Sequence, residues 1–270
     1  MVRRKEAVGV QQDGDSLNEV LLEQFREQMN NLAAAVQLLD PVVREQGEQY
    51  EPYLSILYQS MYRMLRLMGN MEYLQLDRQG SLELREASMD LAGLCRELAG
   101  QVAPLAELAG VQFTYEEEKG MLLTRGDGRL LRRMLLALIA NAVQAAGRGG
   151  RAGLRLAVRG ARASLTVWDS GPGLAGQKRE GGLLDRPAGP GLGLRVARSI
   201  AGAHGGAVVL QQREDRGAQA VVSLPIRPPE KDGMLRTPSM GMDQTGGFSD
   251  LLVELAGVLP YEAYTPRTME

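Results

Sequence analysis

Asn141 stands out first, because it is the one amide within the apolar run Leu138–Ala142. A buried amide without a hydrogen-bond partner costs about 1–3 kcal/mol, so such a side chain requires a partner. Its carbonyl oxygen is a hard ligand of the kind that Mg²⁺ prefers, together with waters and phosphates. The alternative for this segment alone is a structural asparagine that bonds the backbone.

A carboxylate and two glycines follow the strand-like run Ser164–Trp168, in the order Asp169, Gly171 and Gly173. A carboxylate at the end of a strand can accept a hydrogen bond from an exocyclic amine such as that of adenine. The glycines lack a Cβ, so the backbone can pass close to a flat ring. An ordinary Asp-Ser-Gly turn explains the same residues when they are taken by themselves.

A glycine-rich segment leads directly into a predicted helix over residues 194–203. It consists of Gly189, Pro190, Gly191, Leu192, Gly193 and Leu194. The free N–H groups at the start of a helix attract phosphate. Glycine patterns are weak signals when they stand alone, because loops are rich in glycine. The order of the three segments is more specific than any one of them.

Two amphipathic helices are predicted ahead of these segments, the first from Asp15 or Ser16 to near Asp40 and the second from near Glu51. Their apolar residues recur at steps of three and four: Leu17, Leu21, Phe25, Met29, Leu32, Val36 and Leu39, then Leu54, Leu57, Met61, Met64, Met68 and Met71. Such seams are typical of coiled coils and bundles. Two helices alone bury too little surface, so we expect the hairpin to form a four-helix bundle in a homodimer.

The remaining pattern predicts an α+β fold with an α/β sandwich, in which helices cover one face of a mixed sheet. Helices are expected at 87–108 and 129–146, the second largely buried, and strands at 82–84, 111–115, 121–123, 155–158, 164–168 and 220–224. The expected divisions are a flexible arm at 1–14, the hairpin domain at 15–77, the sandwich domain at 78–226 and a tail at 227–270. The tail is polar and mostly flexible, with an apolar patch at 248–259 that could form a short helix.

In residues 78–226, the order of Asn141, Asp169–Gly173 and Gly189–Leu194 resembles the ATP-binding domain of sensor histidine kinases. The resemblance implies that Asn141 holds Mg²⁺ and that Asp169, Gly171 and Gly173 bind adenine. It further implies that ATP phosphates lie against Gly189, Gly191, Leu192, Gly193 and Leu194. The hairpin resembles the dimerisation and phosphoacceptor hairpin of these kinases. Two-component signal transduction, phosphotransferase activity and a response-regulator partner are what the resemblance implies for function.

Several positions depart from the pattern of that family. Arg26 stands where the family has its phosphoacceptor histidine, and arginine has no lone pair for attack on phosphorus. Ala137, one turn before Asn141, stands where relatives carry a polar or acidic residue that positions metal or water. Gln144 replaces a Lys or Arg directed toward the phosphates. The only histidine, His204, is expected to cap carbonyl groups at a helix end, so the sequence offers no catalytic residue.

Three functions fit these residues. The first is an ATP-dependent signalling kinase that works with a response regulator but does not autophosphorylate on its own hairpin. The second is a non-catalytic, nucleotide-gated dimeric scaffold, a pseudokinase that reports ATP occupancy through its conformation. The third is a kinase that phosphorylates a residue in a partner protein.

Composition narrows the class of protein. The chain of 270 residues has a formal net charge of −2, which does not predict a nucleic-acid-binding surface. Cys95 is the only cysteine, which excludes an internal disulfide and favours a reducing, cytoplasmic location. No apolar run reaches the roughly 20 residues that a membrane span requires, so no direct membrane span is expected.

Overall fold

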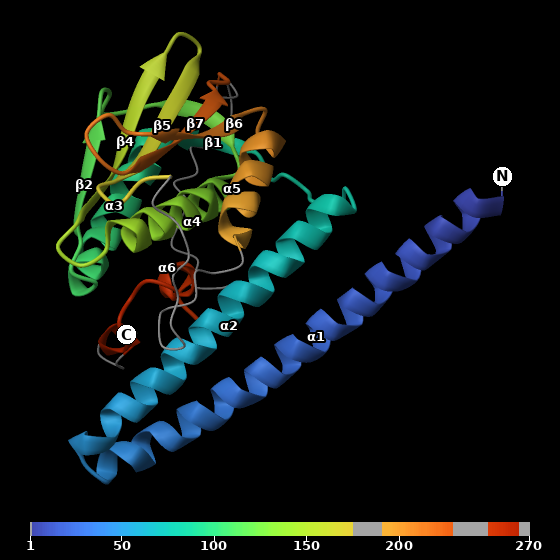
Figure 1. Cartoon of the computed structure of the whole chain (residues 1–270), viewed down its shortest axis with the longest axis vertical. Coiled ribbons are helices and arrows are strands. Elements are labelled where there is room, and N and C mark those ends of the chain that lie inside the picture. The colour runs from blue at the N-terminus through green and yellow to red at the C-terminus, as the bar shows by residue number, and fades with distance from the viewer. Residues whose placement is uncertain (1, 175–190, 229–247, 265–270) are drawn as a thin grey trace. The chain divides into compact units, whose positions relative to one another are not determined.

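The computed structural model describes residues 2–174, 191–228 and 248–264. These residues belong to two compact units, one comprising Met1–Leu82 with Tyr264–Glu270 and the other Glu83–Ala263. Figure 1 shows the hairpin of α1 and α2 in the first unit and a sheet with its helices in the second. The combination of a helical hairpin with an α/β sandwich confirms the predicted α+β class.

The hairpin consists of α1 (Val2–Glu45) and α2 (Glu51–Arg78), with a short 3-10 helix between them. Pro52 lies in the first turn of α2, where its missing N–H leaves no hydrogen bond unmade. α1 begins at Val2 rather than at Asp15 or Ser16, because a helix that has nucleated extends at little cost. It also continues through Pro41 for one further turn. None of the described helices is long and apolar enough to cross a membrane.

The apolar stripes along the hairpin divide into a buried set and an exposed set. The buried residues are Met29, Ala33 and Val36 of α1 and Leu54, Tyr58, Met61 and Leu65 of α2. The exposed residues are Phe25, Leu32 and Leu39 of α1 and Leu57, Met64 and Met71 of α2. The two expected seams are therefore only partly buried within this chain. The reason is that each apolar stripe is wider than a single neighbouring helix can cover.

A five-stranded mixed sheet forms the centre of the second unit, in the order β2-β4-β5-β7-β6. Its strands are β2 (Gln112–Glu117), β4 (Arg151–Arg159), β5 (Arg162–Asp169), β6 (Ala207–Gln212) and β7 (Ala218–Pro225). β2 pairs with β4 in parallel, and the other neighbours are antiparallel. A separate two-stranded antiparallel sheet pairs β1 (Ala87–Asp90) with β3 (Leu123–Gly126).

Helices α3 (Leu91–Leu108), α4 (Gly128–Ala146) and α5 (Leu192–Ala203) cover one face of the five-stranded sheet (Figure 1). Burial alternates along β5 and β7, as it must when only one face of a sheet is covered. α4 packs against β4 and β5 on the sheet and also against α5. It is therefore the element that connects the other parts of the domain.

The short helix α6 (Asp250–Leu255) packs against α4 as well. An ion pair at 3.3 Å joins Arg133 of α4 to Glu254 of α6. With neighbours on several sides, every residue of α4 from Met134 to Ala140 is buried. The prediction that this helix is largely buried is confirmed.

Several elements differ from the sequence prediction. No strand forms at 82–84; the strand is β1, within the segment expected to begin a helix at Ala87. α3 runs through Pro104, although proline usually interrupts a helix, and the strand expected at 121–123 begins only at Leu123. β6 was not predicted, although Val208, Val209 and Leu210 are good strand residues. Its partner β7 provides the cross-strand neighbours that stabilise it.

Candidate functional site

Asn141 lies near the C-terminal end of α4, as an exposed residue between the buried residues Ala140 and Ala142. Asp127 caps the N-terminus of α4, because its Oδ1 accepts hydrogen bonds from the N–H groups of Arg129 (3.1 Å) and Leu130 (3.3 Å). The side chain of Asn141 is exposed, which corrects the expectation of a buried amide. Position 141 therefore faces the uncovered side of α4, because Ala142 and Val143 beyond it are buried again.

Asp169 is the last residue of β5, and its buried carboxylate is used on one side only. Oδ1 accepts hydrogen bonds from Gly171 N at 2.8 Å and from Ala218 N at 3.3 Å. Oδ2 accepts no hydrogen bond from any residue that the structure describes. Two backbone amides therefore fix the carboxylate and leave one oxygen available to a hydrogen-bond donor from outside the protein.

The loop after Asp169 passes so close to its neighbours that side chains cannot be accommodated. A Cβ on Gly171 would lie 2.1 Å from the carbonyl oxygen of Ala145, one turn beyond Asn141 on α4. Gly173 has a φ of +79°, and a Cβ there would lie 2.3 Å from Nε2 of Gln212. Close packing on the backbone thus requires glycine at 171 and the left-handed conformation requires it at 173, and the packing of Gly171 on α4 brings the Asp169 loop next to the segment that carries Asn141.

Two supporting residues of this loop were missed from sequence. Gly217, with a φ of +94°, faces Asp169 so closely that a Cβ would lie 2.0 Å from the Asp169 carbonyl oxygen. Gln212 accepts a hydrogen bond from Leu174 N (2.8 Å) and donates to Gly217 O (2.8 Å). The sequence signal that could have identified this turn was Gly217, directly before β7. Because β6 was not predicted from the sequence, the turn between β6 and β7 could not be placed beside the Asp169 loop.

The third segment begins α5. Gly191 adopts the left-handed conformation (φ 72°) at the N-cap and provides no side chain to cap the helix. The amides of Leu192, Gly193 and Leu194 fall in the first helical turn, where N–H groups lack partners within the helix and favour anions. Gly189 lies outside the described residues. α5 packs against α4, the helix that carries Asn141.

His204 has a structural role, which confirms its predicted position at a helix end. Its Nδ1 lies 2.8 Å from Ile200 O, and its Nε2 accepts a hydrogen bond from Asp127 N at 3.0 Å. The second bond assigns the ring proton to Nδ1, which donates to the carbonyl. His204 thereby joins the end of α5 to the start of α4.

The structure shows the contacts and burial of the three residues that depart from the family pattern, Arg26, Ala137 and Gln144. Arg26 of α1 forms an ion pair with Glu72 of α2, and the hydrogen bond that its guanidinium donates to this carboxylate raises the pKa of the guanidinium. Ala137 is completely buried in α4, so a charged residue at this position would have to be desolvated. Gln144 is exposed, one turn beyond Asn141.

Comparison with known proteins identifies the relatives of this fold. Residues 126–228, which include all three segments, match the family described as histidine kinase-, DNA gyrase B- and HSP90-like ATPase. The sensor protein KdpD of Escherichia coli (strain K12) is 27% identical over 222 residues, which are 78% of this chain and 24% of that protein. The chain thus spans about a quarter of that relative's length.

Two solved structures are similar over most of the chain. Full-length ShkA in complex with AMPPNP has a TM-score of 0.62 and 26% identity, over 77% of this chain and 45% of that one. The histidine kinase ThkA in complex with the response regulator protein TrrA has a TM-score of 0.50 and 21% identity, over 76% of this chain and 60% of that one. The second likeness supports the fold alone.

Proposed function

We propose that this chain belongs to the histidine kinase family and binds Mg-ATP as a signal-transduction protein without a phosphoacceptor histidine of its own, as its similarity to the ATPase family, KdpD and ShkA supports. The observation that carries nucleotide binding is the geometry of Asp169. Its Oδ1 is held by two backbone amides, while Oδ2 has no described partner. A buried acceptor fixed in this way suits the exocyclic amine of adenine, and the absence of a Cβ on Gly171 lets its loop pack directly on α4 beside this acceptor.

Magnesium and phosphate fit the neighbouring residues. The exposed amide of Asn141 offers the hard oxygen ligand that Mg²⁺ prefers, with phosphate oxygens and waters as the remaining ligands. The first turn of α5, at Gly191, Leu192, Gly193 and Leu194, offers free amides to the phosphates. The ATP analogue AMPPNP in the ShkA structure supports the same class of ligand.

Arg26 is the basis for proposing that the hairpin is not autophosphorylated. Its guanidinium is engaged by Glu72, so the side chain is charged, and it has no lone pair to attack phosphorus. Ala137 likewise offers no group to position metal or water. These two positions favour a nucleotide-gated scaffold, or pseudokinase, over a kinase that modifies itself. Phosphorylation of a residue in a partner protein remains the second candidate, because the nucleotide segments are intact.

A homodimer through the hairpin is supported by the exposed apolar residues of α1 and α2. Phe25, Leu32 and Leu39 repeat every seven residues on α1, and Leu57, Met64 and Met71 do so on α2. Apolar heptads are the pattern by which helices associate side by side, and a second hairpin would cover both stripes in a four-helix bundle. A response regulator is the partner proposed from the family, and the cytoplasm is the proposed location.

Calorimetry with Mg-AMPPNP tests nucleotide binding. Wild-type protein is expected to bind one nucleotide per chain, and Asn141→Ala to bind it at least about tenfold more weakly when Mg²⁺ is present. Glu107→Ala, an exposed position on α3, is the control and should bind like wild type. Equal binding by wild type and Asn141→Ala at all Mg²⁺ concentrations would remove the metal assignment.

Incubation with γ-labelled ATP separates the candidate activities. We expect no covalent label on this chain. Label on the chain would contradict the role given to Arg26. Transfer of label to an added response regulator would establish the kinase candidate over the scaffold.

A further inference from the structure

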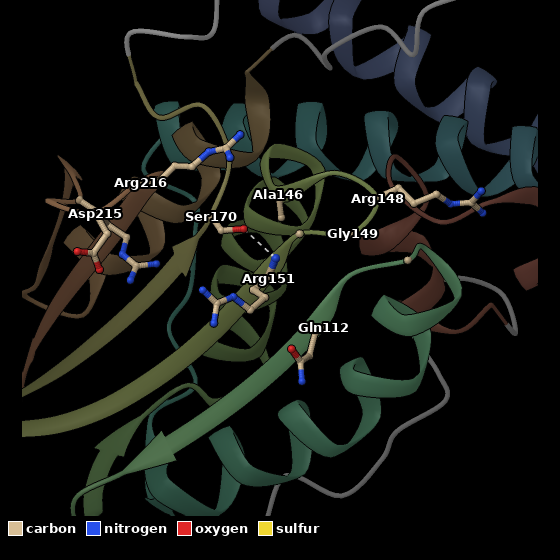
Figure 2. A pocket seen from close by; sticks show the side chains of 11 residues that line it. Gln112, Ala146, Arg148, Gly149, Arg151, Ser170, Asp215 and Arg216 are labelled. Carbon is tan, nitrogen blue, oxygen red and sulfur yellow. Dashed lines mark hydrogen bonds between the residues drawn. The ribbon is translucent and has the colours of Figure 1, made fainter.

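A cavity of about 560 Å³ opens at the end of the sheet where β2 and β4 begin and β5 ends (Figure 2). It is lined by residues of four turns that are distant in sequence, and Asn141, Asp169 and Gly191 are not among them. The cavity therefore shares Ser170 with the Asp169–Gly173 segment, but none of the residues assigned to adenine, Mg²⁺ or phosphate lines it.

The backbone around this cavity is held in place by reciprocal hydrogen bonds. Arg151 N donates to Ser170 Oγ at 2.8 Å, and Ser170 N donates to Arg151 O at 2.9 Å. Gly149 N donates to Gly110 O at 2.7 Å, which joins the turn after α4 to the turn before β2. The cavity is thus formed by the fixed ends of strands.

Four arginines line the cavity, Arg148, Arg151, Arg213 and Arg216, against one aspartate, Asp215. Figure 2 shows Arg216 and Asp215 on one side of Arg151 and Ser170, and Arg148 on the other side. The side chain of Arg148 packs over Gly110, which has a φ of +76°. The missing Cβ of Gly110 leaves room for it, since a Cβ would lie 2.7 Å from Arg148 Cγ.

The charges of these arginines are largely uncompensated. Within the described residues, no carboxylate lies within ion-pair distance of Arg148, Arg151 or Arg216. By contrast, Arg155 forms ion pairs with Glu116 and Glu118, and Arg159 also pairs with Glu118. Arg155 lies on the same strand as Arg151, four residues further along β4. The positive charge at the cavity is therefore a local feature of a chain whose formal net charge is −2.

Arg213 is held differently from the other three. Its guanidinium lies 4.5 Å from the ring centroid of Trp168 and donates to the carbonyl oxygen of Asp169 at 3.1 Å. Stacking and this hydrogen bond fix its orientation, which reduces the entropy that a ligand would have to remove.

We propose that this cavity is a second anion site, which takes a small molecule carrying two or more phosphate groups. Guanidinium groups present planar pairs of donors that match phosphate oxygens. The volume lies within the range of small-molecule sites and exceeds what a single phosphate would fill. The arginines lie on different sides of the opening, so a ligand with separated charges contacts them better than one compact ion.

Calorimetric titration of the full chain with inorganic pyrophosphate, in the presence of saturating AMPPNP, tests the proposal. Wild type is expected to bind pyrophosphate at one site. Arg151→Gln is expected to weaken this binding by about tenfold, because one charge-assisted contact is lost, and Arg151→Gln with Arg216→Gln by more. Arg155→Gln is the matched control on the same strand and should leave the affinity unchanged. AMPPNP affinity should be the same in all of these variants.

Three results would overturn the proposal. The first is no pyrophosphate binding to the AMPPNP-saturated wild type, which would place any binding in the nucleotide site. The second is an equal loss in Arg155→Gln, which would indicate general surface charge. The third is equally tight binding of citrate through the same arginines, which would show that the cavity does not select phosphate.

Discussion

Replacing Asp169 by asparagine or by alanine separates the two functions of its carboxylate. Oδ1 accepts from two backbone amides and holds the loop, whereas Oδ2 is the oxygen assigned to the purine. Asparagine can place its carbonyl oxygen at the Oδ1 position and keep both bonds. Its NH₂ group then occupies the Oδ2 position and faces the amine of adenine donor to donor.

The expected magnitudes follow from these bonds. Losing a hydrogen bond to a charged acceptor costs about 1.5–3 kcal/mol, so Asp169→Asn should weaken AMPPNP binding by about 10- to 150-fold. The free energy of unfolding of this variant should fall by no more than about 1 kcal/mol. Asp169→Ala leaves the buried amides of Gly171 and Ala218 without acceptors, which costs about 1–3 kcal/mol each in free energy of unfolding.

Urea unfolding followed by circular dichroism and calorimetry with AMPPNP measure the two effects. Asp90→Asn is a matched control, because Asp90 Oδ1 also accepts from two backbone amides, Ala92 N (3.1 Å) and Leu122 N (2.9 Å), at the cap of α3. It should change stability as little as Asp169→Asn does and leave nucleotide affinity intact. Wild-type affinity in Asp169→Asn, or an equal loss of affinity in Asp90→Asn, would refute the assignment of Oδ2.

Three further predictions concern single positions. Gly171→Ala should lower the free energy of unfolding by about 1–3 kcal/mol in urea unfolding, because its Cβ would lie 2.1 Å from Ala145 O. Gly202→Ala on α5 is the control, and it should be neutral or stabilising in the same measurement because a Cβ there meets no atom within 4 Å. Gln144→Lys should tighten Mg-ATP binding several-fold in calorimetry by adding a cation near the phosphates, and unchanged affinity would show that position 144 does not face them. Burial raises the pKa of the Cys95 thiol to about 12, so at pH 8 only about one thiol in 10⁴ is ionised. Ellman's reagent should therefore react only with unfolded protein. Rapid reaction of the folded chain would contradict this burial.

The exposure of Asn141 illustrates what local sequence leaves open. Its apolar neighbours predicted a buried helix, and Met134–Ala140 are indeed buried. Ala142 and Val143 beyond it are buried again, so the exposure of position 141 depends on which side of α4 its neighbours leave uncovered. That side is set by contacts between residues far apart in the chain.

The hairpin shows the same division. The steps of three and four residues determined that α1 and α2 are amphipathic helices, because those steps place side chains on one face. They could not show that Met29 and Val36 face inward while Phe25 and Leu32 remain exposed. That choice depends on the angle at which the second helix lies, and so does the pairing of Arg26 with Glu72.

The sequence by itself determined the α+β class, the largely buried helix α4 and the order of the three motif segments, because these depend on hydrophobic periodicity and on residue types along the chain. Only the tertiary structure decided that Gly217 faces Asp169 and that Arg148, Arg151, Arg213 and Arg216 surround one cavity. These neighbours come from separate strands and turns, and the register of the sheet, a long-range property, brings them together.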